Sequence, residues 1–267
     1  MEDRKDEFLS MSNPTFEEKK EIEDVLVIDN LYKSYGKGAN KKEVLKGLNL
    51  VVKKGEVFGF IGKNGIGKST TIDCIVGLKE QDSGNILING KNTLEEPLEV
   101  KFEIGYVPSE PTTYEVMSGN EYLQFIASAY QMSQASFENN YNYLVMKLSM
   151  SEKDMNRKIR EYSHGMKQKI CLMASLIHNP KLWILDEPTV GLDIMVYETL
   201  VKMIREFADN GRTVFVTSHN IEMVSKLCDR VAIINSGKVD KLFDLNADPI
   251  KRRDLGKIFF RTYGEKY

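Results

Sequence analysis

The chain is poor in the residues that stabilise secreted proteins, and it lacks the long apolar runs of membrane-spanning ones. Only three cysteines, Cys74, Cys171 and Cys228, occur in 267 residues, and none belongs to a C-x-x-C pair. We expect them to be buried apolar side chains in a reducing compartment, without a disulfide framework or a metal site. No run of 18 apolar residues is present, which argues against a membrane-spanning helix. The first seven residues lack the basic start and apolar stretch of a signal peptide, so the sequence predicts a cytosolic protein.

A strong charge of either sign is also missing, because the formal net charge is −2. This balance gives no reason to expect nucleic-acid binding, and we predict no nucleic-acid partner. Residues 1–24 differ from the rest, with acidic side chains outnumbering basic ones and little apolar periodicity. We expect a charged N-terminal extension there that carries no chemistry.

What the chain does contain is a complete phosphate-binding loop, G-x-x-x-x-G-K-S/T, within residues 62–70. The apolar run 57–61 precedes it and an apolar-periodic segment through Ile72, Ile75 and Val76 follows it, which is the strand–loop–helix context that the motif requires. The loop glycines let backbone N–H groups point at a polyphosphate, Lys68 reaches the β- and γ-phosphates, and the Ser69 hydroxyl ligates Mg²⁺. We therefore predict binding of ATP and Mg²⁺ by the loop residues Gly62, Asn64, Gly65, Gly67, Lys68, Ser69 and Thr70.

Apolar runs at 57–61, 182–185, 213–217 and 231–234 are continuous, as in strands buried on both faces, and helical stretches separate most of them. They predict an α/β fold, a P-loop NTPase core with a mainly parallel sheet. Near the N-terminus, Val25–Ile28 and Asn85–Asn89 predict an antiparallel β portion, and Asn49–Val52 is expected to form a hairpin with Val57–Ile61. The segment at about 112–178 is mostly helical in pattern and is interpreted as an inserted helical subdomain.

Two adjacent carboxylates follow the apolar strand 182–185. Because ligands bind at the carboxyl edge of open α/β sheets, Asp186 is expected to hold Mg²⁺ beside Ser69, and Glu187 to face the water that attacks the γ-phosphate. The strand 213–217 ends in Ser218 and His219, and a histidine there can contact the γ-phosphate and the catalytic water. We predict Lys68, Glu187 and His219 as the catalytic residues.

With these motifs in this order, residues 25–240 resemble the nucleotide-binding subunit of ATP-binding cassette (ABC) transporters. The family's signature segment, Leu-Ser-Gly-Gly-Gln, is matched by residues 162–166, in which Ser163 and Gly165 are kept while His164 and Met166 replace the first glycine and the glutamine. Such variants resemble the exporter branch whose membrane partners are ABC-2 type permeases, including drug- and peptide-resistance exporters. The resemblance also implies that Tyr35 stacks on adenine and that Asp193 belongs to the loop that links the two ATP sites.

The resemblance further implies an ATPase that drives transport, and a head-to-tail dimer in which Ser163 and Gly165 close the partner's ATP site. The partners would be integral membrane permease subunits and a second ATPase subunit, in a homodimer or a heterodimer, at the cytoplasmic face of the membrane. Residues 241–267 would be a C-terminal extension to the ATPase domain at 25–240. The family usually has a glutamine after Gly-Tyr-Val-Pro, but here Ser109 and Glu110 follow Pro108, so we place both at the hinge to the helical subdomain.

Three other classes of protein share some of these sequence features. An importer ATPase subunit stays open as an alternative. A soluble cassette protein would usually carry two cassettes or a long coiled coil, and only one cassette and no long heptad run occur here. A P-loop GTPase is disfavoured because the Asn-Lys-Lys-Glu segment at 40–43 precedes the phosphate loop and ends in the wrong acid for reading guanine.

Overall fold

The computed structural model describes residues 24–189, 192 and 194–264, so nearly all of the predicted N-terminal extension lies outside it. The strands, in chain order, are β1 (Asp24–Tyr35), β2 (Lys42–Lys53), β3 (Val57–Ile61), β4 (Ser83–Ile88), β5 (Lys91–Asn92), β6 (Ile104–Val107), β7 (Leu182–Asp186), β8 (Thr213–Ser218), β9 (Arg230–Asn235) and β10 (Lys238–Asp244). The α-helices are α1 (Lys68–Ile75), α2 (Pro97–Glu103), α3 (Gly119–Ala129), α4 (Gln134–Lys147), α5 (Glu152–Asn156), α6 (His164–Leu176), α7 (Ile194–Asp209), α8 (Ile221–Leu227) and α9 (Pro249–Thr262). Two short 3₁₀ helices are η1 (Gly38–Asn40) and η2 (Ile159–Glu161).

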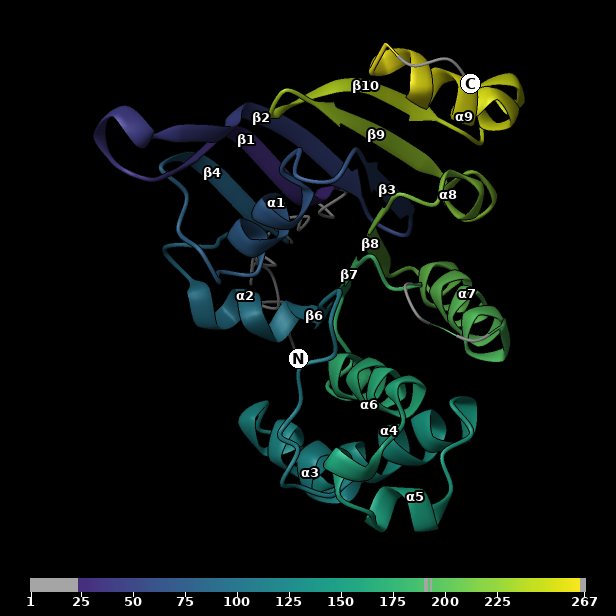
Figure 1. Cartoon of the computed structure of the whole chain (residues 1–267). Helices are drawn as coiled ribbons and strands as arrows, with labels where there is room; N and C mark the ends of the chain where they lie inside the picture. The colour runs from purple at the N-terminus through teal and green to yellow at the C-terminus, as the bar shows by residue number, and fades with distance from the viewer. Residues whose placement is uncertain (1–23, 190–191, 193, 265–267) are drawn as a thin grey trace, which may run out of the picture.

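The strands form two sheets (Figure 1). The smaller sheet, in the order β2-β1-β4-β5, is antiparallel and corresponds to the predicted N-terminal β portion. The larger has the order β10-β9-β3-β8-β7-β6, and every neighbouring pair in it except β10–β9 is parallel. The predicted α/β fold with a mainly parallel sheet is therefore confirmed.

The hairpin predicted between Asn49–Val52 and Val57–Ile61 is wrong. The first segment lies in β2 and pairs with β1, whereas the second is β3 and pairs with β8 and β9 in the other sheet. The turn between them is hydrogen-bonded to β8. The Gly55 N–H donates to Thr213 Oγ1 over 3.1 Å, and the Glu56 carbonyl accepts the Val214 N–H over 2.9 Å. The turn thus connects two sheets.

The parallel sheet separates two apolar cores, as alternation along a strand requires. On β3, Phe58 and Phe60 face the antiparallel sheet and α1, while Val57 and Ile61 face the opposite side with α6 to α9. Every residue of β3, β7 and β8 is buried, which matches the continuous apolar runs read from the sequence. This double burial fixes the strand ends that carry the polar motifs.

Helices α3 to α6 form the lower lobe in Figure 1, within the predicted subdomain at about 112–178. The C-terminal end of α6 is joined closely to the sheet. A Cβ added at Gly105 on β6 would lie 2.1 Å from the Ser175 carbonyl oxygen, so only glycine permits this backbone approach. In addition, the Trp183 indole N–H donates to Ser175 Oγ over 3.0 Å. These contacts attach α6 to β6 and β7.

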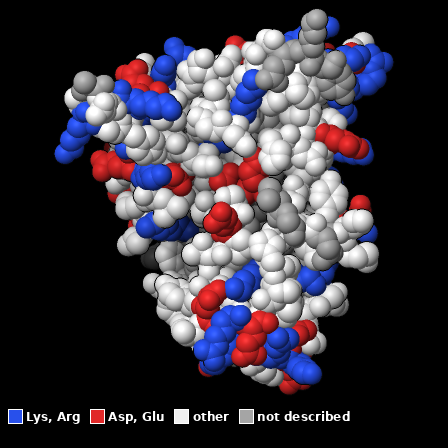
Figure 2. Space-filling model, in the orientation of Figure 1, with Lys and Arg blue, Asp and Glu red and all other residues white. Residues whose placement is uncertain are grey.

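The three cysteines are free and buried, as the sequence predicted. No helix in the described part of the chain is long and apolar enough to cross a bilayer. On the face drawn in Figure 2, described Lys and Arg side chains are interspersed with Asp and Glu. At the other end of the chain, β10 runs across position 240, where the sequence places the start of the C-terminal extension, and that boundary stays a prediction.

Candidate functional site

The polar motifs meet at one edge of the parallel sheet. Register pairs Ile61 with Ser218, and Asp186 with Thr217, so the carboxyl ends of β3, β8 and β7 lie side by side. The phosphate loop leaves this edge after β3, and His219 leaves it after β8. Most of the predicted site residues are therefore brought together by sheet topology alone.

The phosphate loop passes close to neighbouring strands, and its glycines permit this. A Cβ at Gly62 would lie 2.5 Å from Ile234 Cγ2, and Gly67 has a φ of +121°, which side chains rarely adopt. Asn64 and Gly65 are exposed at the tip, where Gly65 also has a positive φ of +74°. From Gly67 the chain enters α1, whose first residue is Lys68.

Lys68 is the buried cation of this edge, with 6% of its surface exposed. Its ammonium donates to the Gly62 carbonyl over 2.9 Å and to the Lys63 carbonyl over 3.4 Å. It also lies 3.4 Å from Glu187 Oε1. A cation in a buried position attracts phosphate oxygens strongly, because little water screens it.

Glu187 connects this cation to the predicted histidine. Its Oε2 lies 2.8 Å from His219 Nδ1 and accepts the His219 backbone N–H over 3.1 Å. The backbone at Glu187 has a φ of +48°, an uncommon conformation for a residue other than glycine. The structure thus places Lys68, Glu187 and His219 in one connected set, as a general base and its orienting partner require.

Asp186 is the other carboxylate of the edge and is 3% exposed. Burial raises its pKa, and the negative charge of Glu187 acts the same way, whereas hydrogen bonds from Thr217 and Ser69 and the charge of Lys68 lower it. Thr217 Oγ1 donates to Asp186 Oδ1 over 2.5 Å. The Asp186 carboxylate and the Ser69 hydroxyl are the hard oxygen ligands that suit Mg²⁺, and a bound cation would offset the cost of a buried charge.

Thr217 was not among the predicted site residues. Besides holding Asp186, its hydroxyl accepts the Glu187 N–H over 3.1 Å, so it orients both acids of the motif. The available signal was its position as a polar residue at the end of an otherwise apolar strand, directly before Ser218 and His219.

Tyr35 ends β1 beside the start of α1. Its hydroxyl lies 3.5 Å from Thr70 Oγ1, and the ammonium groups of Lys79 and Lys33 lie 5.2 and 5.7 Å from its ring centroid. This position, next to the phosphate loop, suits a ring that would contact the base of a nucleotide.

The signature residues lie on a different element. Ser163 is the N-cap of α6, where its hydroxyl accepts the Met166 N–H over 3.3 Å, and Gly165 lies in the first turn of that helix. Both therefore begin a helix of the lower lobe and do not belong to the sheet edge. Asp193 lies outside the described residues. Ser109 and Glu110 lie in the loop between β6 and α3, and Ser109 borders a narrow gap together with Pro188 and Leu192.

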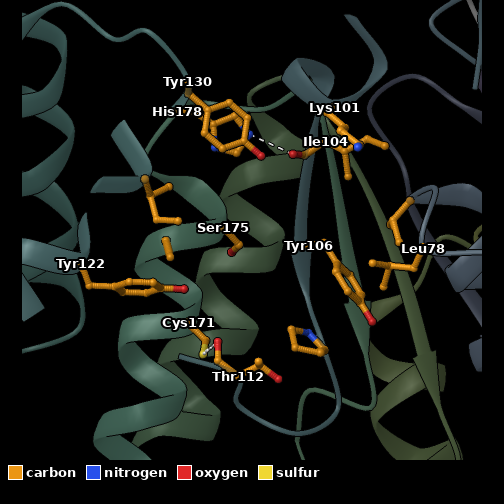
Figure 3. A pocket seen from close by; sticks show the side chains of 14 residues that line it. Leu78, Lys101, Ile104, Tyr106, Thr112, Tyr122, Tyr130, Cys171, Ser175 and His178 are labelled. Carbon is orange, nitrogen blue, oxygen red and sulfur yellow. Dashed lines mark hydrogen bonds between the residues drawn. The ribbon is translucent and has the colours of Figure 1, made fainter. Parts of the chain in front are cut away.

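A cavity of about 290 Å³ lies between the sheet and the lower lobe (Figure 3). Tyr130 and His178 stack at one end with ring centroids 3.7 Å apart, and Cys171 and Thr112 lie at the other. Tyr106 on β6 faces the space between them, and burial raises the pKa of its hydroxyl. Aromatic and aliphatic side chains make up most of the cavity lining, and Lys101 is the lining residue with a full charge.

Comparisons with known proteins agree with the fold. A family model described as ABC transporter matches residues 45–190. The linearmycin resistance ATP-binding protein LnrL of Bacillus subtilis is 38% identical over 215 residues, which cover 80% of this chain and 68% of that protein. The SkfA peptide export ATP-binding protein SkfE of the same organism is 32% identical over 215 residues, with 80% and 87% covered.

Solved structures show the same relationship. A structure titled as the ATP-binding subunit of an ABC transporter superposes with a TM-score of 0.78 at 32% identity, and 87% of this chain and 93% of that chain are covered. A dimeric ATP-binding cassette bound to ADP and Pi has the same fold, with a TM-score of 0.75 at 24% identity over 82% of this chain and 98% of that one.

Proposed function

Since this chain belongs to the ABC transporter family and hydrolyses ATP to drive transport, we propose that it energises a membrane exporter through a separate permease of the ABC-2 type. The observation that carries the catalytic part is the set of Lys68, Asp186, Glu187 and His219 at one sheet edge. The export direction is supported by the resistance and peptide-export proteins among its relatives. The chain would act at the cytoplasmic face of the membrane.

In the proposed mechanism each residue of the edge has one task. Lys68 neutralises phosphate charge, and Glu187 takes the proton of the attacking water or orients that water, while His219 fixes the Glu187 carboxylate. Ser69 and Asp186 would hold Mg²⁺, which spreads the negative charge of the phosphates when bound. Tyr35 would stack on the adenine. Most of the rate enhancement comes from fixed charges and positions.

We propose that two such chains close around ATP, because Ser163 and Gly165 begin a helix away from the loop of their own chain. The N-terminal end of α6 carries a partial positive charge, which suits the γ-phosphate of a partner's ATP. Asp193 is proposed to lie in the same interface between the two chains, called the seam below. A homodimer has two equivalent sites, and a heterodimer with a related cassette has the same geometry.

The permease is proposed to contact the cavity of Figure 3. Large apolar side chains surround it on the outside: Leu78, at its margin, is 65% exposed, and Phe102 and Phe125 are 43% and 45% exposed. Phe102 packs edge-on against Tyr130 in the cavity wall. Exposed apolar side chains beside a cavity are typical of a protein interaction site, and an apolar segment of the permease fits this chemistry.

The test is co-purification from membranes. We expect the wild-type chain to retain a polytopic membrane subunit, and Leu78→Asp to lose it while keeping basal ATPase activity within about twofold, since Leu78 is 65% exposed at the cavity margin and is not one of the residues of the sheet edge. Met146→Asp is the matched control, because Met146 is 69% exposed on α4 and lies outside the patch.

Two results would contradict the proposal. Retention of the membrane subunit by Leu78→Asp at the level of Met146→Asp would remove the patch from the interface. A recovered subunit of an importer type would overturn the exporter assignment and leave the ATPase assignment intact.

A further inference from the structure

A tyrosine just beyond α9 reaches the phosphate loop from 200 residues away in the sequence. The Tyr263 hydroxyl donates to the Ile234 carbonyl at the end of β9, and it accepts the Lys63 backbone N–H over 3.4 Å. Its ring lies edge-on to Phe259, with centroids 5.1 Å apart, and the Lys63 ammonium lies 4.8 Å from its centroid. The position of Tyr263 is therefore fixed at its hydroxyl by two hydrogen bonds and at its ring by Phe259 and Lys63.

The contact acts on one particular peptide group. The N–H of Lys63 and the carbonyl of Gly62 belong to the same peptide unit, the first of the phosphate loop. Tyr263 binds this N–H, while Lys68 donates to this carbonyl over 2.9 Å. A peptide unit bound at both ends cannot rotate without breaking a hydrogen bond.

The surroundings leave that peptide unit little alternative. A Cβ at Gly62 would lie 2.8 Å from Ile66 Cγ2 and 3.2 Å from the Tyr263 hydroxyl, so loop, strand and tyrosine are in close contact. The ring is partly buried, and burial raises the pKa of the Tyr263 hydroxyl, which keeps it protonated as a donor to Ile234. The hydroxyl joins the end of β9 to the start of the loop.

We propose that Tyr263 is a positioning residue that preorganises the phosphate loop for nucleotide, so that α9 sets ATP affinity. A loop already held in one conformation loses less entropy when it closes on phosphates, which strengthens binding without altering the chemical step. The proposal rests on the proposed role of the loop in binding ATP. Tyr263 itself touches no reacting atom.

Tyr263→Phe is the sharpest test, because it removes the hydroxyl and keeps the ring with its contacts to Phe259 and Lys63. We expect the Kd for a non-hydrolysable ATP analogue, and the KM for ATP, to rise about fivefold, as for the loss of one ordinary hydrogen bond, with kcat within twofold. Amide hydrogen exchange should become faster at residues 62–67. The unfolding midpoint should fall by no more than a few degrees, because the Ile234 carbonyl also loses its donor.

Tyr143→Phe is the matched control. It also removes a hydroxyl that makes a 3.4 Å hydrogen bond, in that case to Glu206 on α7, and it should change neither the Kd nor exchange in the loop. An unchanged Kd in Tyr263→Phe would overturn the proposal, as would a rise in Kd without faster exchange at 62–67. Lys68→Ala separates the two ideas: if it also leaves nucleotide affinity unchanged, the proposed role of the loop fails, and otherwise only the role of Tyr263 does.

Discussion

Glu187 owes its position to its backbone. Its N–H is bound by the carbonyl and the hydroxyl of Thr217, over 3.2 and 3.1 Å, and its left-handed φ of +48° turns the chain directly after β7. The side chain therefore points back across the sheet edge to Lys68 and His219. Strained backbone at a reactive carboxylate is a recurring feature of functional sites.

We expect Glu187→Gln to lower turnover by a factor of about 10²–10⁴, because an amide cannot accept the proton of the water. ATP binding should survive, since the shape and the contacts of the phosphate loop are kept, and light scattering should detect an ATP-dependent dimer. Glu206→Gln is the control. Glu206 accepts a 2.8 Å hydrogen bond from Lys147 and does not belong to the sheet edge that carries Glu187. Wild-type turnover in Glu187→Gln would remove Glu187 from the mechanism.

The sequence predicted the motif residues because their spacing is set by local geometry, a loop between strand and helix or two acids after a strand. It missed Thr217, whose role depends on β8 lying next to β7, and which has no motif of its own. Phe125 follows Tyr122 by three residues, the spacing of one helical face, yet its side chain is 45% exposed and packs against Tyr114. Periodicity identifies a helix but cannot distinguish a face that is fully buried in the core from one that is half exposed.

At the scale of elements, His178 connects α6 to β6. Its Nε2 lies 2.9 Å from the Ile104 carbonyl, which requires a proton on that nitrogen, and its ring stacks on Tyr130. Burial lowers the pKa of His178 to about 4. The native protein thus keeps this imidazole neutral where the unfolded chain, with a pKa near 6.5, is already protonated.

The sign of the pH effect follows from linkage. Between about pH 6.5 and 4 the unfolded chain binds more protons at His178 than the native one, so stability falls as the pH is lowered through that window. From pH 7 to 5 we expect His178 to account for about 1–2 kcal/mol of lost unfolding free energy. His178→Gln keeps an N–H donor but does not titrate, so urea unfolding should show a smaller loss. Equal losses in both proteins would exclude His178 as the source.

The wrong hairpin belongs to this scale as well. A Lys-Lys-Gly-Glu turn between two apolar runs is a reasonable hairpin signal. The two runs differ, however: burial alternates along the second half of β2, whereas all of β3 is buried. A strand buried on both faces has to lie inside a sheet covered on both sides, which placed β3 between β8 and β9.

At the scale of the whole molecule, the signature residues carry the most distinctive expectation. Ser163→Arg should leave ATP binding by the monomer intact and abolish ATP-dependent dimerisation and hydrolysis, because a bulky charge then occupies the seam. Ser133→Arg is the control for a lost helix cap, since the Ser133 hydroxyl caps α4 by accepting a backbone N–H over the same 3.3 Å. The Ser133→Arg protein should still dimerise.

Mixing Ser163→Arg with Lys68→Ala chains should restore part of the activity, because the mixed dimer keeps one site with both residues intact. Sedimentation measures ATP-dependent dimerisation, and phosphate release measures ATP hydrolysis. A Ser163→Arg protein that dimerises and hydrolyses ATP like wild type would rule out composite sites.

Long-range placements such as Tyr263 against Lys63, 200 residues apart, lay beyond sequence reasoning, because no local pattern encodes the docking of α9.

The close approach of Gly105 to Ser175 makes α6 a lever. Its C-terminal end is fixed to β6 and β7, and its N-terminal end carries Ser163. With 13 residues and a rise of about 1.5 Å per residue, the helix is about 20 Å long, so a tilt of about 5° at the sheet would move Ser163 by about 1.7 Å. A side chain at position 105 would push the C-terminal end of α6 away from the sheet. The resulting tilt of the helix would displace Ser163 farther than a hydrogen bond tolerates, although position 105 is not part of the proposed dimer interface.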